Sequence, residues 1–161
     1  MNPDDLQAIQ RLVLAALLGG LLGWQRERRQ RPAGLRTHIL VAMAAAGFTL
    51  AGVYGFAGES QLRDPARVAA GVVTGMGFLG AGTIFRTGTT VRGLTTGASI
   101  WLAGALGLMA ASGLMVLSIV AALLGWFTLA ALPRIIDALI GSDGAAHPGA
   151  EGESSPTTPP D

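Results

Sequence analysis

Residues 94–132 read LTTGASIWLAGALGLMAASGLMVLSIVAALLGWFTLAAL, and none of these side chains is charged. Two apolar stretches, 94–111 and 114–132, are separated only by Ser112 and Gly113. Each is close to the roughly 20 residues that a helix needs to cross the hydrocarbon core of a bilayer. The segment therefore predicts a tight antiparallel pair of membrane-spanning helices.

Three further apolar stretches precede this pair, at 6–24, 38–57 and 68–85. Half of all residues are hydrophobic, only 13% are charged, and the mean hydropathy is +0.50. This composition excludes an ordinary soluble enzyme. It predicts an all-α fold, a polytopic membrane bundle of about five transmembrane helices.

The chain divides into two regions by composition. Residues 1–140 are expected to form one transmembrane domain. Residues 141–161 contain four prolines and four acidic residues but no apolar side chain larger than alanine. Such a segment cannot bury enough apolar surface to order itself, so we expect a disordered cytoplasmic tail.

The arginines predict the orientation in the membrane. All eleven basic residues are arginine, and alternate loops place eight of them on one side and two on the other. Arg11 lies inside the first stretch and is expected to extend toward the outer surface. Loops rich in arginine face the cytoplasm, so the N-terminus is predicted to lie outside and the C-terminus inside.

The segment 26–36 holds five arginines next to the first predicted helix. Juxtamembrane arginines attract anionic lipids by about 1 kcal/mol each, so these lipids are an expected partner of the loop Arg26–Arg36. Glu27 is the only acidic residue in the segment, and we expect it to pair with a neighbouring arginine.

The third stretch is rich in glycine. Gly71 and Gly75 share one helix face with Arg67, Thr74 and Phe78, and a Gly-x-x-x-Gly pattern lets another backbone approach closely. Helix packing is one interpretation of this face. The alternative is that the missing side chains open a passage or let the helix bend.

The residues at the start of the third stretch also suggest a local structure. Asp64 precedes Pro65 and is expected to cap the helix by accepting backbone N–H bonds. Arg67 follows three residues later, just inside the apolar stretch, where a guanidinium is expensive without a partner. We therefore expect either an ion pair between Asp64 and Arg67 or a bond from Arg67 to carbonyls of another helix.

The fourth stretch carries a polar stripe at helical spacing, formed by Arg92, Thr95, Thr96, Ser99 and the small Ala103. Hydroxyls in membrane helices usually bond to their own backbone, so a packed polar seam is one interpretation. A path for an ion or a small solute is the other.

Two short matches suggest an internal repeat. GLLG at 20–23 matches GFLG at 77–80, and GLRT at 34–37 matches GLTT at 93–96. Both matches fall at equivalent places, near the end of one helix and the start of the next. The first two and the next two helices could therefore be parallel repeats, and chance similarity in glycine-rich membrane sequence is the alternative.

Several functional classes lack support in the sequence. No acidic residue lies within an apolar stretch, although Mg²⁺ sites and proton relays use carboxylates. There is no cysteine and no known catalytic motif. We expect no enzyme activity, no cofactor, no metal site and no nucleic-acid partner.

Three groups of motifs, which cover residues of about 15–110, resemble those of a known family. The first is GWQRERR at 23–29 with RPAGLRTH at 31–38, and the second is DPARVAA at 64–70 with GMGFLGAG at 75–82. The third combines FR at 85–86, VRGLTT at 91–96 and SIW at 99–101. Together they resemble the MgtC/SapB family of bacterial inner-membrane proteins.

This resemblance implies a multi-pass protein of the bacterial inner membrane with a role in adaptation to low magnesium. The family's best-known member regulates other membrane machines, including the proton-driven ATP synthase, and does not itself transport magnesium. Longer members of the family add a soluble C-terminal domain after the last span. At that place this sequence has the acidic tail. The candidate functional residues are Arg26, Glu27, Arg28, Arg36, Thr37, Asp64, Arg67, Gly71, Gly75, Arg86, Arg92, Thr95, Thr96 and Ser99.

Two hypotheses about function follow. The first is a regulatory or interaction protein that binds other inner-membrane proteins through glycine-rich helix faces. The second is a small channel or transporter subunit with a path along the glycine-rich third helix and the Thr/Ser-lined fourth. A glycine-rich bundle of this size is also expected to form homo-oligomers.

Overall fold

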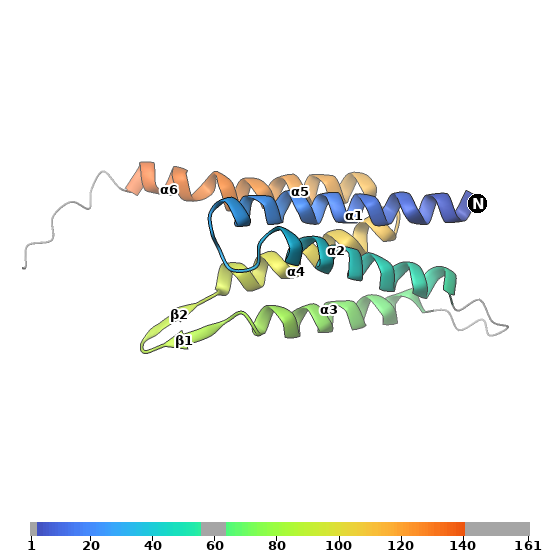
Figure 1. Ribbon diagram of the computed structural model, residues 1–161, viewed down its shortest axis with the longest axis horizontal. Coiled ribbons are helices and arrows are strands. Elements are labelled where there is room, and N and C mark those ends of the chain that lie inside the picture. The colour runs from blue at the N-terminus through green and yellow to red at the C-terminus, as the bar shows by residue number, and fades with distance from the viewer. Residues whose placement is uncertain (1–2, 56–63, 141–161) are drawn as a thin grey trace, which may run out of the picture.

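The computed structural model describes residues 3–55 and 64–140, and nearly all of them are helical (Figure 1). The predicted tail at 141–161 lies outside this part of the chain. In order, the elements are α1 (Pro3–Arg28), α2 (Leu35–Leu50), a π-helical turn η1 (Ala51–Gly55), α3 (Pro65–Ala81), β1 (Phe85–Thr87), β2 (Thr90–Arg92), α4 (Leu94–Ala111), α5 (Met115–Ala130) and α6 (Leu132–Ile140).

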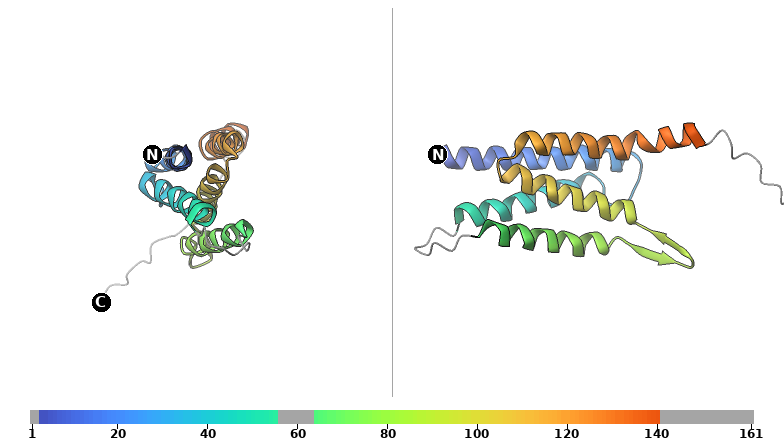
Figure 2. Two further views of the ribbon diagram at one scale, coloured as in Figure 1. Left: turned by 90° about the vertical axis from the view of Figure 1, so that its right-hand side faces the viewer. Right: turned by 180° about the vertical axis from the view of Figure 1, so that it is seen from behind.

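Helix α4 is the centre of the bundle, because it packs against α1, α2, α3 and α5. Figure 2 shows α1 and α5 on one side of this centre and α3 at the opposite edge. Helix α6 continues beyond α5 and contacts mainly that helix. Consecutive long helices run in opposite directions, as the apolar stretches joined by short loops predict.

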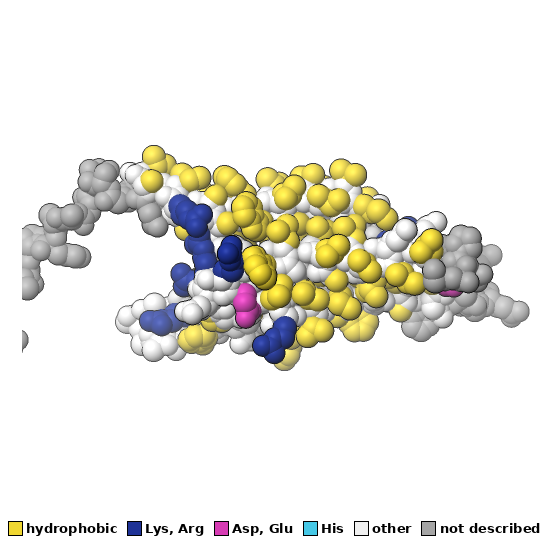
Figure 3. Space-filling view, turned by 45° about the horizontal axis from the view of Figure 1, so that its top comes forward, with side chains coloured by type: hydrophobic (Ala, Val, Ile, Leu, Met, Phe, Trp, Pro, Cys, Tyr) yellow, Lys and Arg dark blue, Asp and Glu magenta, His cyan; other side chains and the backbone are white. Residues whose placement is uncertain are grey.

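Three of the described helices are long and apolar enough to cross a membrane: Asp4–Arg28, Leu35–Gly55 and Leu94–Ala111. Helix α5 is apolar but shorter, with 16 residues. Large exposed hydrophobic side chains cover the middle of the molecule, as expected for a surface in contact with lipid (Figure 3). The all-α membrane bundle is thus supported, while a count of five spans stays a prediction.

The second and third predicted spans need correction at their ends. The second helix begins at Leu35 instead of residue 38, and its regular α-helical part ends at Leu50. The third begins at Pro65 and ends at Ala81, so Phe85 lies in a strand and not in the predicted span. Helix ends depend on capping, which a search for apolar stretches does not detect.

The hairpin of β1 and β2 was not predicted from the sequence. Phe85 pairs with Arg92 and Thr87 with Thr90, and Gly88 adopts a positive φ of 61° in the turn. Gly93 also has a positive φ, 90°, and a Cβ there would collide with the carbonyl oxygen of Thr83. Glycine is therefore required where the hairpin returns to α4.

The core consists largely of alanine and glycine. The largest fully buried side chains are Leu22, Leu106, His38 and Ser118. Helices α2 and α4 approach so closely at Gly107 that a Cβ would collide with the backbone of Ala42. Dense packing of backbones, and not large side chains, holds the bundle together.

The two repeated motifs occupy equivalent places in the fold. GLLG lies near the end of α1 and GFLG near the end of α3, while Gly34 and Gly93 are the residues that precede α2 and α4. A Cβ on Gly23 would meet the start of α2, and one on Gly80 would meet Gly97 near the start of α4. Each motif thus packs a helix end against the next helix in the chain.

Candidate functional site

Most of the candidate residues gather at one end of the bundle, which we call the arginine end. It comprises the end of α1, the loop 29–34, the starts of α2 and α4, and the β1–β2 hairpin. Figure 3 shows arginine side chains collected here beside the apolar middle. The helix ends therefore bring together segments that lie far apart in the sequence.

Arg26 is buried at this end, with only 5% of its surface exposed. Its Nη2 donates to the carbonyl oxygen of Pro32, at 3.1 Å, and to the hydroxyl of Thr96. Its Nε is buried and has no hydrogen-bond acceptor among the described residues. The lipid-attracting loop predicted from the sequence thus contains one arginine that points inward and connects α1 to α4.

His38 is completely buried beside this arginine. Its Nδ1 lies 2.9 Å from the carbonyl oxygen of Gly34, and its Nε2 lies 3.1 Å from the hydroxyl of Ser99. Because a carbonyl only accepts, Nδ1 carries a proton. Nε2 then accepts from Ser99 when the ring is neutral. When the ring is charged, Nε2 donates, and Ser99 donates to the carbonyl of Thr96, 2.9 Å away.

Two further side chains near the end of α1 bind the end of α5. Gln25 Nε2 donates to the carbonyl of Leu129, and Arg29 Nη2 donates to that of Ala130, both at 2.8 Å. The last carbonyls of a helix have no partner within it, so these bonds satisfy them. Sequence reasoning missed Gln25 because its acceptor belongs to a helix about 100 residues later.

Among the described residues Glu27 forms no ion pair with an arginine, contrary to our expectation. Its Oε2 accepts the backbone N–H of Leu35, at 2.9 Å, and so caps the first turn of α2. The guanidinium of Arg28 lies over the ring of Trp24, 5.6 Å from its centroid. Arg36 is exposed and Thr37 half-buried in the same turn of α2.

The polar stripe of α4 divides into a buried and an exposed part. Thr96, Ser99 and Ala103 face the core, which fits the packed seam predicted as one interpretation. Thr95 is exposed. We had expected Arg92 to extend this helix face. It does not, because it lies exposed in β2.

The start of α3 shows a cap without the expected ion pair. Asp64 accepts the backbone N–H groups of Ala66 and Arg67, at 3.0 and 3.3 Å, which confirms the predicted cap. No ion pair between Asp64 and Arg67 and no side-chain bond from Arg67 to a carbonyl occurs in the described part of the chain. Arg67 is exposed, so solvent or a lipid headgroup can neutralise it.

The glycine face of α3 is open. A Cβ added to Gly71 or Gly75, which share this face, would meet nothing within 4 Å. The expected close approach of another helix therefore does not occur there within the described residues. Glycines at the packed helix crossings lie elsewhere, as at Gly80 and Gly107.

Two other arginines, Arg86 and Arg11, each donate to a backbone carbonyl. Arg86 Nε donates to the carbonyl of Gly88, at 2.7 Å, and supports the hairpin turn. Arg11, which we expected to extend toward the outer surface, is half-buried, and its Nη1 donates to the carbonyl of Ala111, at 2.9 Å, at the opposite end of the bundle from the arginine end.

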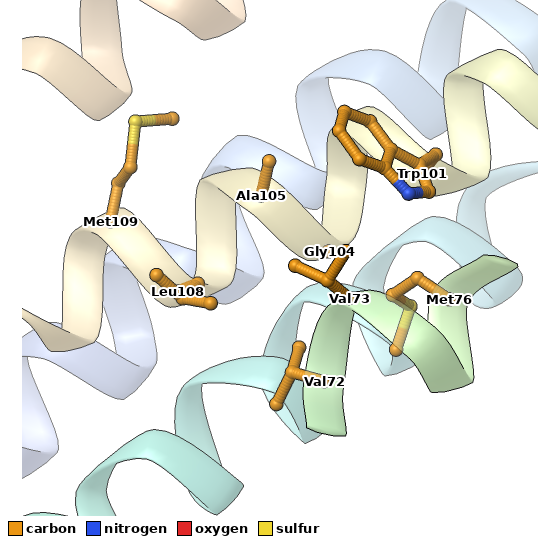
Figure 4. A pocket seen from close by; sticks show the side chains of 8 residues that line it. All are labelled: Val72, Val73, Met76, Trp101, Gly104, Ala105, Leu108 and Met109. Carbon is orange, nitrogen blue, oxygen red and sulfur yellow. The ribbon is translucent and has the colours of Figure 1, made fainter. Parts of the chain in front are cut away.

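A cavity of about 140 Å³ lies between α3 and α4 (Figure 4). Apolar side chains line it, among them Val72, Met76, Trp101 and Leu108. Its chemistry does not suit a cation. No group of three or more His, Asp or Glu side chains that could hold a metal occurs among the described residues.

The comparison with known proteins agrees with this architecture. Residues 12–138 match the model of the MgtC family. The chain belongs to the MgtC family. The matched region begins in α1 and ends in α6, so it contains the arginine end, the hairpin and the open face of α3.

Several relatives share part of this region. The chain is 48% identical over 103 residues to the "Putative magnesium transporter YhiD" of Escherichia coli (strain K12), which covers 62% of this chain and 48% of that protein. It is 52% identical over 93 residues to "Protein MgtC" of Brucella abortus (strain 2308), which covers 58% and 37%. For "Protein MgtC" of Salmonella typhimurium (strain LT2), the identity is 48% over 99 residues, with 62% and 41% covered.

The chain thus matches less than half the length of each of these relatives. No solved structure matches it. Membership of the MgtC family together with the apolar helices identifies the chain as a helical membrane protein.

Proposed function

We propose that this MgtC-family chain is a multi-pass inner-membrane protein that regulates other membrane proteins during adaptation to low magnesium. Five spans with an external N-terminus fit the arginine distribution and the alternating helix directions. The observation that carries the proposal is the open glycine face of α3, which is suited to bind a helix of another protein.

Helices in a bilayer associate through small residues, because lipid offers no hydrophobic driving force between them. Elsewhere in this chain, glycines such as Gly19, Gly23 and Gly107 already lie against a neighbouring helix. On α3, in contrast, Gly71 and Gly75 lie on one helix face, and both face open space. These positions can accept a partner helix without any rearrangement of the bundle.

The exposed arginines Arg28 and Arg36 would assist by attracting anionic lipids to the arginine end. A second copy of this chain is one partner that could occupy the α3 face. The proposal favours a different inner-membrane protein, in keeping with a regulatory role.

A channel or transporter subunit is the second candidate, because the Escherichia coli relative is named a putative magnesium transporter. Against it, the hydroxyls of Thr96 and Ser99 are buried and bonded to Arg26 and His38. Among the described residues these hydroxyls are therefore bonded to other side chains, and the packed seam is the interpretation that they support.

The proposal is tested with paired glycine variants. Gly75 and Gly47 both face open space, on α3 and α2 respectively. Gly75→Leu should abolish rescue of a deletion strain in low magnesium, because leucine fills the docking face. Gly47→Leu should rescue growth, because that glycine lies outside the face.

Cross-linking identifies the occupant in the same strains. Phe78 is 81% exposed on α3 and Phe127 is 49% exposed on α5, so each can be replaced by photoreactive benzoylphenylalanine. We expect a cross-linked protein from position 78 that Gly75→Leu removes, and little from position 127. An adduct with a second copy would show a homo-oligomer instead. Normal growth and unchanged cross-linking in Gly75→Leu would contradict the proposal.

Transport is tested separately with purified protein in liposomes. Flux of an ion that disappears in Ser99→Ala would favour the channel hypothesis. Absence of flux together with a captured membrane protein would favour regulation.

A further inference from the structure

Arg26 places an uncompensated charge inside the arginine end. Only 5% of its surface is exposed. No acidic side chain of the described residues forms an ion pair with it. Glu27, the neighbouring acid, is itself exposed and binds the N–H of Leu35. A buried charge without a counter-charge is strongly unfavourable. An anion at this place would compensate the charge of Arg26.

Two hydrogen-bond donors near the guanidinium of Arg26 lack acceptors among the described residues. The Nε of Arg26 is buried and lacks an acceptor within the described chain. Thr96 accepts from Arg26, and its own hydroxyl proton has no acceptor among the described residues. Gly93, which precedes α4, provides no side-chain cap for the first N–H groups of that helix.

The helix dipoles add to this positive potential. Helices α2 and α4 both begin at the arginine end, and the contact of His38 with Ser99 joins them within their first two turns. The N-terminus of a helix favours negative charge and binds phosphate groups through its backbone N–H groups. The positive charge of Arg31 also acts on Arg26 and adds to the positive potential of the arginine end.

We propose that the arginine end contains a binding site for a phosphate group, formed by Arg26, Thr96 and the first turn of α4. Guanidinium groups bind phosphate with charge-assisted hydrogen bonds, which fits the unsatisfied donor of Arg26. The phosphate belongs to a lipid headgroup or to a free phosphate compound. The site differs from the diffuse attraction of lipids to exposed arginines, and it does not depend on the regulatory role of the α3 face.

The first experiment uses inorganic phosphate as the probe. The full chain is purified into phosphatidylcholine nanodiscs, and its thermal unfolding is followed by tryptophan fluorescence in phosphate or in chloride of equal ionic strength. We expect phosphate to raise Tm, because a ligand that binds only the folded state stabilises it. Arg26→Gln should weaken phosphate binding by about tenfold or more, since a charge-assisted bond is lost.

The second experiment uses lipids. Native mass spectrometry compares retention of phosphatidylglycerol with retention of phosphatidylcholine. If the bound phosphate group belongs to a lipid headgroup, the wild-type chain retains phosphatidylglycerol and Arg26→Gln loses this lipid. In nanodiscs that contain phosphatidylglycerol, inorganic phosphate then has no further effect on Tm. If the source is free phosphate, only the first experiment responds to Arg26→Gln.

Arg36→Gln is the matched control, because it removes the same charge from an exposed residue of the arginine end. It should retain wild-type binding of inorganic phosphate, and it should lose much less phosphatidylglycerol than Arg26→Gln does, because an exposed arginine attracts anionic lipid only diffusely. Thr96→Val should weaken binding, and Arg26→Lys should bind more weakly than wild type while it retains the charge. Equal losses in Arg26→Gln and Arg36→Gln would overturn the proposal, as would a lack of response of the wild-type chain to both probes. If Arg26→Gln does not fold, unchanged binding in Arg26→Lys and Thr96→Val would overturn it.

Discussion

Arg11 belongs to α1 but satisfies the end of α4. Its Nη1 donates to the carbonyl of Ala111, the last residue of that helix, where the helix dipole is negative. Gly113 follows with a positive φ of 84° and lies against the same guanidinium. A single side chain thus connects α1 to the turn between α4 and α5.

We expect Arg11→Leu to lower the free energy of unfolding by about 1–2 kcal/mol, because a charge-assisted bond to the end of α4 is lost. Thermal unfolding in detergent, followed by tryptophan fluorescence, measures the change. Arg36→Leu is the control, since Arg36 is exposed, and it should stay within about 0.5 kcal/mol of wild type. Equal stability of all three proteins would show that the Arg11 bond contributes nothing.

At the scale of elements, glycines determine how closely the helices approach. Gly80 of α3 and Gly97 of α4 lie against each other's backbone: a Cβ added to either would stand only 3.2 or 2.9 Å, respectively, from the nearest atom of the other. Gly104 of α4 packs against the side chain of Met76. Gly107 of α4 packs against the backbone of α2. Because α4 contacts four other helices, its glycines are more constrained than those of α3.

Gly107→Ala should therefore destabilise the bundle by about 1–3 kcal/mol, because its Cβ would collide with the backbone of Ala42. Gly47→Ala, at an open position in α2, should leave stability unchanged or raise it by up to about 1 kcal/mol through helix propensity. Thermal unfolding of the two variants and the wild-type chain measures both changes in stability. If Gly107→Ala is as stable as Gly47→Ala, α2 and α4 do not pack as closely as this crossing requires.

At the scale of the whole molecule, the two ends of the bundle differ in charge. The loop 29–34 and the β1–β2 hairpin lie at the arginine end, whereas the α4–α5 turn lies at the other (Figure 1). The apolar surface between them is as expected for a protein embedded in lipid. The positive-inside rule therefore predicts that the arginine end faces the cytoplasm.

Single cysteines test this orientation without a background, because the chain has no cysteine of its own. Ser112→Cys, in the α4–α5 turn, should react with an impermeant thiol reagent in intact spheroplasts. Thr89→Cys, in the hairpin turn, should react only after permeabilisation. The reverse pattern would invert the topology, and labelling of both positions in intact cells would mean that α4 does not cross the membrane.

Local properties of the sequence determined the helical character of the chain, most helix positions and the concentration of arginine at one end. Apolar stretches, the Asp64 cap and the repeated glycines before α2 and α4 act within one or two helical turns, so they can be recognised from neighbouring residues. The motifs of 23–38, 64–82 and 85–101 likewise sufficed to indicate the family.

Only the tertiary structure decided which of these arginines and glycines contact residues far away in the sequence. Arg26 and Arg36 are alike in the sequence, yet Arg26 is buried against Thr96, 70 residues later, while Arg36 is exposed. Likewise, Gly75 is open and Gly107 is packed. The physical reason is that burial and hydrogen bonding between helices depend on how the helices are rotated and placed against one another, which composition and spacing along one helix do not determine.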